Sequence, residues 1–230
     1  FHYRNKMEFT YSASEYVPEN EKNRAPSDFA LGLHAPGRWD KILNINKCHI
    51  QTSIANEILT EVKEMTSILE PYNMREHTGF LRNIMIRVGA NTGEVMVNIV
   101  TSREDNKALN PMVESLIEKF PSITSIVNNI TTRKSGVSKG EHQVVLNGNE
   151  YMLEKLGKYE FMISADSFFQ INTRQAEKLY DIVLEELELT GKEIVYDLFC
   201  GTGSISIYIS SHAKMVYGFE LVIPAVQDAM

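Results

Sequence analysis

One stretch toward the C-terminal end of the sequence constrains the fold more than any other. Residues 195–204 read Val-Tyr-Asp-Leu-Phe-Cys-Gly-Thr-Gly-Ser, a strand pattern that runs into a glycine turn and then a helix. A second strand pattern follows and ends on Glu220. Together they predict a βαβ unit whose glycine turn lets a ligand approach the backbone and the first helical N–H groups. An acid in the position of Glu220 suits a ribose hydroxyl pair, so the pattern indicates a site for a nucleoside-containing cofactor.

The residues around the turn favour one cofactor class. A dinucleotide fingerprint needs a third glycine where this chain has Ser206, and the carboxylate of Asp197 would repel a pyrophosphate. That carboxylate suits the positively charged amino-acid end of S-adenosylmethionine, and a nicotinamide dehydrogenase is correspondingly disfavoured. Two alternatives stay open: an ordinary strand-to-helix turn without a ligand, and an Asp197 that only holds the turn through backbone N–H groups.

The rest of the chain divides into two predicted domains, residues 1–160 and 161–230. The first is expected to be mixed α+β. It begins with an alternating strand that has Tyr3, Met7, Phe9 and Tyr11 on one side, followed by a helix with Ile54, Ile58, Val62, Met65 and Leu69 on its core face. A hairpin of residues 80–88 and 94–100, a helix from Pro111 and strands at 123–130 and 143–146 are expected after it. The second begins with a helix capped at Asn172 or Thr173 and ended by Gly191, which leads into the βαβ unit. The predicted fold class is therefore α/β, with a mixed α+β domain followed by the first βαβ unit of a Rossmann-like domain.

Composition excludes few functions. The 230 residues are 43% hydrophobic and 23% charged, as in ordinary globular proteins, and no apolar run is long enough to cross a membrane. Two cysteines far apart in sequence form neither a zinc nor a disulfide framework, so a cytoplasmic location is the default expectation. The net charge of −7 argues mildly against nucleic-acid binding. Residues 131–140, however, contain Arg133, Lys134 and Lys139 without an acid.

Two motifs in combination carry a family resemblance. The segment Phe-Phe-Gln-Ile-Asn at 168–172 is followed by a helix, by Asp-Leu-Phe-Cys-Gly-Thr-Gly at 197–203, and by Phe-Glu at 219–220. This arrangement resembles the RNA uracil-5-methyltransferases, S-adenosylmethionine enzymes that make 5-methyluridine in ribosomal or transfer RNA. Residues 4–7 and 79–87 are similar to the central domain of that family, so the resemblance covers nearly the whole chain. It implies the central domain and the start of a class I methyltransferase domain.

The resemblance also implies roles for five residues. Gln170 would contact the methionine end of the cofactor, and Phe199 and Gly201 would line the pocket through the turn. Ser204 stands where some members place another cofactor contact, often an asparagine. Glu220 would bind the ribose hydroxyls, in agreement with the acceptor capacity of a carboxylate.

Structural alternatives accompany these assignments. Gln170 could brace the following helix instead of a ligand. Phe168 and Phe169 are expected in the core more readily than against a base. Arg82 and Arg87 lie on an alternating strand and are expected on a solvated face rather than on RNA.

The family's chemistry is covalent. A cysteine thiolate adds to C6 of uracil, C5 then takes the methyl group, and a general base removes the C5 proton. In the family, that cysteine, an aspartate-proline motif and the base all lie beyond the position matching Glu220. No catalytic residue is therefore assigned in this chain, and we expect that the chain alone does not methylate RNA. Cys200 lies in the glycine turn and is not expected to be the nucleophile.

Cys48 precedes a helix, as does the last of four cluster cysteines in some family members. An iron-sulfur cluster needs about four thiolates, so it is expected only in a longer parent chain, and Cys48 is expected here as a free cysteine. The remaining alternatives are a non-catalytic RNA-binding or interaction module and a different S-adenosylmethionine enzyme. Ribosomal RNA is the favoured partner and transfer RNA the other; the sequence does not indicate the oligomeric state.

Overall fold

The computed structural model describes residues 1–134 and 140–229, so Lys139 of the basic segment lies outside the described residues. The chain forms two compact units. The first comprises Phe1–Val88 and Val95–Glu150, and the second comprises Gly89–Glu94 and the chain from Tyr151 onward. The sequence predicts a domain boundary at residue 160, and this stays a prediction. The compact units of the structure divide earlier, between Glu150 and Tyr151.

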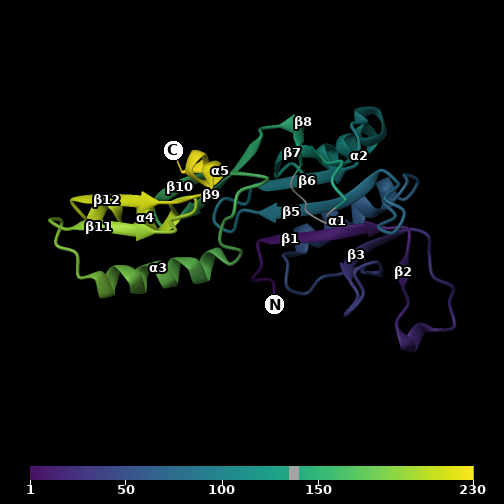
Figure 1. Cartoon of the computed structure of the whole chain (residues 1–230), viewed down its shortest axis with the longest axis horizontal. Helices are drawn as coiled ribbons and strands as arrows, with labels where there is room; N and C mark the ends of the chain where they lie inside the picture. The colour runs from purple at the N-terminus through teal and green to yellow at the C-terminus, as the bar shows by residue number, and fades with distance from the viewer. Residues whose placement is uncertain (135–139, 230) are drawn as a thin grey trace. The chain divides into compact units, whose positions relative to one another are not determined.

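The first unit is built on one mixed sheet (Figure 1). Its elements are β1 (Lys6–Ser12), β2 (Glu15–Tyr16), the short helix η1 (Glu19–Glu21), β3 (Ala30–His34), β4 (Ile42–Asn44), α1 (Ser53–Thr66), β5 (Leu81–Val88), β6 (Val95–Thr101), α2 (Asn106–Lys119), β7 (Ile123–Ile130) and β8 (His142–Gly148). Within the described residues the strand order is β2-β4-β3-β1-β5-β6-β7-β8. The predicted hairpin is β5–β6, and α2 connects β6 to the parallel strand β7.

Hydrophobic periodicity placed most of the core of this unit correctly, but Tyr3 is wrong: it precedes β1 and is 50% exposed. Alternate residues of β1, Met7, Phe9 and Tyr11, are buried against α1 and the central strands. The side chain of Thr52 caps α1, and Ile58 and Val62 on the predicted face of that helix are fully buried. The mixed α+β part of the predicted fold class is therefore confirmed.

Two predicted details are wrong. Arg82 and Arg87 do not lie on a solvated face: they are 4% and 2% exposed, because β5 is a central strand paired with β1 and β6 and all its residues are buried. The helix expected from Pro111 begins earlier, at Asn106. The carboxylate of Asp105 accepts the Ala108 N–H at 3.1 Å and caps it there, so Pro111 lies inside the helix.

The second unit contains the predicted βαβ pattern. Its elements are β9 (Tyr151–Leu156), β10 (Tyr159–Ser164), α3 (Thr173–Leu187), β11 (Ile194–Leu198), α4 (Ser204–Ile209), the short helix η2 (Ser210–His212), β12 (Met215–Phe219) and α5 (Ile223–Asp228). Strands β11 and β12 are parallel neighbours joined through α4, which confirms the predicted βαβ unit. Asn172 caps α3 as predicted, but the helix ends at Glu188 in a left-handed conformation rather than at Gly191.

Hydrogen bonds to β9 hold the hairpin loop Gly89–Glu94 in the second unit, and one buried carboxylate accepts two of them. Glu154 on β9 is 1% exposed and accepts the N–H groups of Ala90 at 2.6 Å and Asn91 at 3.1 Å. The same carboxylate accepts the hydroxyl of Thr173 at 3.0 Å. It therefore ties the hairpin loop, β9 and the first turn of α3 into one cluster.

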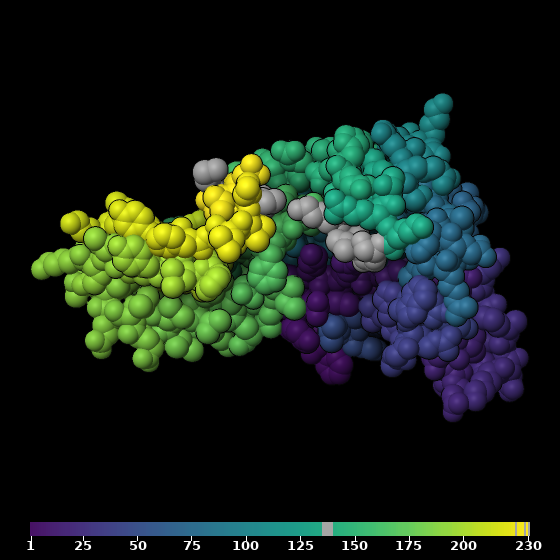
Figure 2. All heavy atoms as spheres, in the orientation of Figure 1, coloured from purple at the N-terminus to yellow at the C-terminus, as the bar shows by residue number. Residues whose placement is uncertain are grey.

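The βαβ region is open to solvent. One face of the β11–β12 pair is exposed, with Tyr196, Leu198, Tyr217 and Phe219 on it. Figure 2 shows this region, yellow-green to yellow, at the surface of the second unit. In the part of the chain that the structure describes, no helix has both the length and the apolar character that crossing a bilayer requires.

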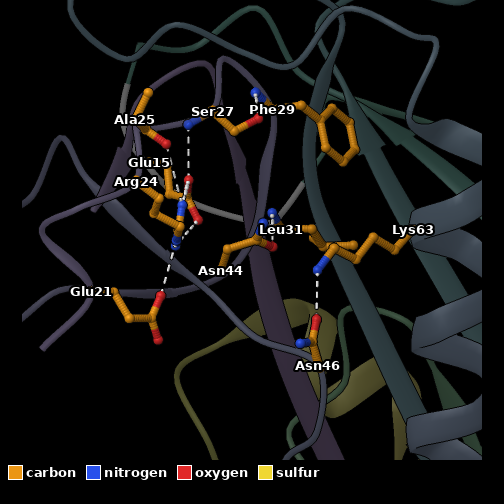
Figure 3. A network of polar contacts seen from close by, with 10 residues as sticks. All are labelled: Glu15, Glu21, Arg24, Ala25, Ser27, Phe29, Leu31, Asn44, Asn46 and Lys63. Carbon is orange, nitrogen blue, oxygen red and sulfur yellow. Dashed lines mark hydrogen bonds and ion pairs between the residues drawn. The ribbon is translucent and has the colours of Figure 1, made fainter. Parts of the chain in front are cut away.

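An ion pair between a buried carboxylate and a partly exposed arginine anchors the loop between β2 and β3 (Figure 3). Glu15, whose side chain is 2% exposed, binds Arg24 through both carboxylate oxygens, at 2.7 and 2.9 Å, and accepts the Ser27 N–H at 2.8 Å. The hydrogen bonds from Arg24 lower the pKa of Glu15 more than burial raises it. Glu15 therefore contributes stability at pH values above the pKa of an unfolded glutamate, and this contribution is lost as pH falls through the lowered folded pKa.

We expect Glu15→Gln to lower the free energy of unfolding by about 1–3 kcal/mol at pH 7, because the network loses its negative charge and one of its two acceptor oxygens. The difference from wild type should shrink toward pH 3 as the wild-type carboxylate becomes protonated. Urea unfolding at both pH values measures this. Glu19→Gln, which removes only the exposed pair with Lys22, is the control. An equal loss at both pH values would contradict the assignment.

Candidate functional site

The turn between β11 and α4 has an unusual backbone. Phe199, Gly201 and Gly203 have φ angles of 64°, 58° and 71°, so three of five consecutive residues are left-handed. A Cβ at Gly201 would meet no atom within 4 Å, which means that this peptide borders open space. The N–H groups of Phe199 and Cys200 donate to the carbonyl of Phe219 at 2.8 and 3.1 Å, which fixes the turn to the end of β12. The result is a rigid backbone surface that a ligand can approach closely.

Glu220 closes this surface at the end of β12. One carboxylate oxygen accepts the Gly201 N–H at 3.0 Å, and the other accepts those of Leu221 at 2.8 Å and Val222 at 2.9 Å. These backbone donors, Val222 first, hold the pKa of Glu220 below its usual range, so the side chain is ionised at neutral pH. A carboxylate has about four acceptor positions, of which three are used here. One remains for a ligand.

A cavity of about 380 Å³ lies against the turn, within the second unit. All five residues predicted from the sequence line it: Gln170, Phe199, Gly201, Ser204 and Glu220. The structure thus brings together positions as far apart in sequence as Gln170 and Glu220. Their roles toward a ligand stay predictions.

Asp197 and Ser206, the residues that break the dinucleotide fingerprint, are partners. The Ser206 hydroxyl donates to the Asp197 carboxylate at 2.6 Å, and Asp197 lines the cavity. Cys200 lies beside them, and burial together with the carboxylates of Asp197 and Glu220 raises the pKa of its thiol. A protonated thiol is a poor nucleophile, which agrees with the expectation that Cys200 is not catalytic.

The two phenylalanines before Gln170 have different surroundings. Phe169 is 6% exposed and packs on Phe161 with ring centroids 5.5 Å apart, as expected for a core residue. Phe168 is 71% exposed and lies at the cavity, so the core expectation is wrong for this residue. Its carbonyl accepts the Thr202 hydroxyl at 3.4 Å, which links the segment before α3 to the glycine turn.

Tyr180 is a site residue that sequence reasoning missed. It lies on α3, and its ring is fully buried. Its hydroxyl, however, lies 2.8 Å from that of Ser204 and also forms a hydrogen bond with the Gln170 side chain. The signal available in sequence was a tyrosine on an apolar helix face, whose hydroxyl must find a partner when the ring is buried. Tyr180 therefore joins two predicted cofactor contacts.

Within residues 1–134 and 140–229, no group of three or more His, Cys, Asp and Glu side chains could hold a metal ion. Cys48 is buried, and its backbone N–H and carbonyl bind the Asn56 side chain at 2.7 and 3.0 Å. The conditional iron-sulfur hypothesis stays a prediction about a longer chain.

Comparison with curated proteins supports the resemblance. No protein-family model matches the chain. An uncharacterized RNA methyltransferase of Chlorobaculum tepidum is 42% identical over 235 residues, which cover 99% of this chain and 49% of the relative. One of Porphyromonas gingivalis is 36% identical, with 99% of this chain and 51% of the relative covered. The chain thus spans about half the length of the curated relatives it matches.

A solved structure has the same fold. The tRNA (uracil-54, C5)-methyltransferase of Pyrococcus abyssi, in complex with S-adenosyl-L-homocysteine, superposes with a TM-score of 0.76 at 27% identity. The match covers 99% of this chain and 50% of that chain. The resemblance to RNA methyltransferases and the methyltransferase fold class predicted from sequence are confirmed.

The hydrogen bond between Tyr180 and Ser204 should couple α3 to the turn energetically. We expect Tyr180→Phe and Ser204→Ala each to lower the free energy of unfolding by about 0.5–1.5 kcal/mol, and the double variant to lose less than the sum. Denaturant unfolding of the four proteins measures the coupling. Thr190→Ala, which removes an exposed bond to Glu193, combined with Ser204→Ala, is the control pair and should be additive. Additivity for Tyr180 and Ser204 would show that the bond is absent.

Proposed function

We propose that this chain carries part of the cofactor site of an S-adenosylmethionine-dependent RNA methyltransferase that methylates C5 of a uridine. The observation that carries the proposal is the convergence of Gln170, the left-handed turn and Glu220 on one cavity. The named relatives and the uracil-C5 enzyme with the same fold support the reaction class. The favoured substrate is ribosomal RNA, with transfer RNA as the other candidate.

The residues of the cavity suit the chemical parts of this cofactor. Asp197 supplies a negative charge near the turn, which complements a cationic amino-acid end, and Gln170 supplies an amide beside it. The free acceptor position of Glu220 accepts one ribose hydroxyl. Binding a second hydroxyl through Glu220 would require the Gly201 N–H to give up its bond to the carboxylate.

The bound cofactor would supply the methyl group from its sulfonium centre, and the sulfur would leave as a neutral thioether. This chain's residues would hold its two ends and keep Asp197 oriented through Ser206. The covalent route needs a reactive cysteine near the target base. Neither of the chain's two cysteines suits that role, because Cys48 is buried and the pKa of Cys200 is raised. We therefore propose no nucleophile among them and expect no methyl transfer by this chain alone.

The test is calorimetry with S-adenosylhomocysteine. We expect saturable binding that Glu220→Ala weakens by roughly tenfold or more, because an ionised acceptor of the ribose is lost. Glu186→Ala, on the exposed side of α3, removes the same charge away from the cavity and should leave affinity unchanged.

Competition distinguishes the alternatives. NAD⁺ should not displace S-adenosylhomocysteine, because the Asp197 carboxylate repels a pyrophosphate. Binding of NAD⁺ alone would favour the dehydrogenase alternative. RNA binding without any S-adenosylhomocysteine binding would favour the non-catalytic RNA-binding module.

A further inference from the structure

A second cavity, of about 210 Å³, lies within the first unit and is not part of the proposed cofactor site. Strands β1, β3 and β5 contribute residues to it, and loop residues complete it. Among the lining residues are Trp39, Tyr72, Arg82 and Lys134. The cavity thus combines aromatic rings with cationic side chains, and no carboxylate belongs to its described lining.

An ion pair fixes two walls of this cavity to one another. Asp40, 4% exposed, receives the Arg75 guanidinium, with the Arg75 Nε at 2.7 Å from a carboxylate oxygen and a second nitrogen bound to the same oxygen. The loop that carries Trp39 is thereby held against the loop that contains Tyr72. The Trp39 side chain is nevertheless 64% exposed. Because the ion pair of Asp40 already holds the loop in place, a ligand that stacks on the exposed Trp39 indole would order little additional chain, and the entropic cost of binding would be low.

Arg82 holds the third wall. Its guanidinium stacks over the Tyr72 ring at 4.3 Å, and one of its nitrogens donates to the backbone carbonyls of Thr131 at 3.2 Å and Arg133 at 2.6 Å. These bonds tie the guanidinium to the chain at the end of β7. They also fix the backbone next to Lys134, whose exposed side chain lines the same cavity.

We propose that this cavity binds one unpaired RNA nucleotide, with the base stacked on the Trp39 indole and a backbone phosphate near the Lys134 ammonium. Single-stranded RNA is recognised by stacking of splayed bases on aromatic side chains, combined with cations that follow the phosphates. The inference rests on the proposed function, in that RNA is taken as the substrate. It adds a contact separate from the cofactor cavity, and its binding is measured separately.

Trp39 is the chain's only tryptophan, so its fluorescence reports directly on this cavity. The probe is a fluorescein-labelled hexauridylate, with unlabelled hexauridylate for the fluorescence titration. We expect saturable quenching of Trp39, with the same dissociation constant as anisotropy of the labelled probe. Binding without quenching would overturn the proposal.

Substitutions test the stacking. Trp39→Ala should weaken binding roughly 5- to 150-fold in the anisotropy assay, whereas Trp39→Phe should retain most of the affinity. Tyr3→Ala removes another exposed aromatic ring from the first unit and is the matched control. Wild-type affinity in Trp39→Ala would place the RNA elsewhere and overturn the inference.

Lys134→Gln tests the phosphate contact. It also tests the site independently if Trp39→Ala fails to fold. It should weaken binding at low salt and reduce the slope of log affinity against log salt by about 1. Lys107→Gln, at an exposed position of α2, is the control. An unchanged slope in Lys134→Gln would contradict the phosphate contact. Loss of S-adenosylhomocysteine binding with quenching retained would refute the proposed enzyme but not this site.

Discussion

The bonds from the backbone to Glu220 are the interaction on which the candidate cofactor site depends. A left-handed Phe199 is strained by about 1–3 kcal/mol, and such strain persists only where neighbouring bonds over-determine the conformation. Here the Phe219 carbonyl holds the start of the turn and the Glu220 carboxylate holds Gly201. Both come from the end of β12. The parallel pairing of β11 and β12 therefore sets the shape of the turn, and the turn sets the cavity.

A second set of bonds brings Gln170 to that turn. The buried carboxylate of Glu154 binds Thr173 in the first turn of α3, directly after the Asn172 cap. One side of the helix start is thus fixed to β9. Two turns further along, Tyr180 binds both Ser204 and Gln170. The Gln170 amide is therefore positioned by two sets of protein bonds: the bond of Glu154 at the start of α3, and the bonds of the Tyr180 hydroxyl.

Local constraints explain what the sequence predicted. The glycine turn, the Asn172 cap and the alternation of β1 each depend on a few residues that are close together in the sequence. All three are present in the structure. Long-range partners explain what it missed. The burial of Arg82 depends on the strands beside β5, and the role of Tyr180 depends on a hydroxyl 24 positions later. The β9–β10 hairpin also escaped prediction, and with it the division of the chain at Glu150.

The net charge of the chain is a weak argument against nucleic-acid binding, because several of its acidic side chains are already in ion pairs. The chain carries −7 overall, yet its buried acids are committed to partners: Glu15 to Arg24, Asp40 to Arg75 and Glu61 to Lys119. Lys134, by contrast, is exposed at the wall of the second cavity, whose described lining contains no carboxylate. The potential inside a cavity follows the unpaired charges at its walls, not the sum over the chain. An acidic protein can therefore offer a phosphate a favourable site wherever its acids are already paired.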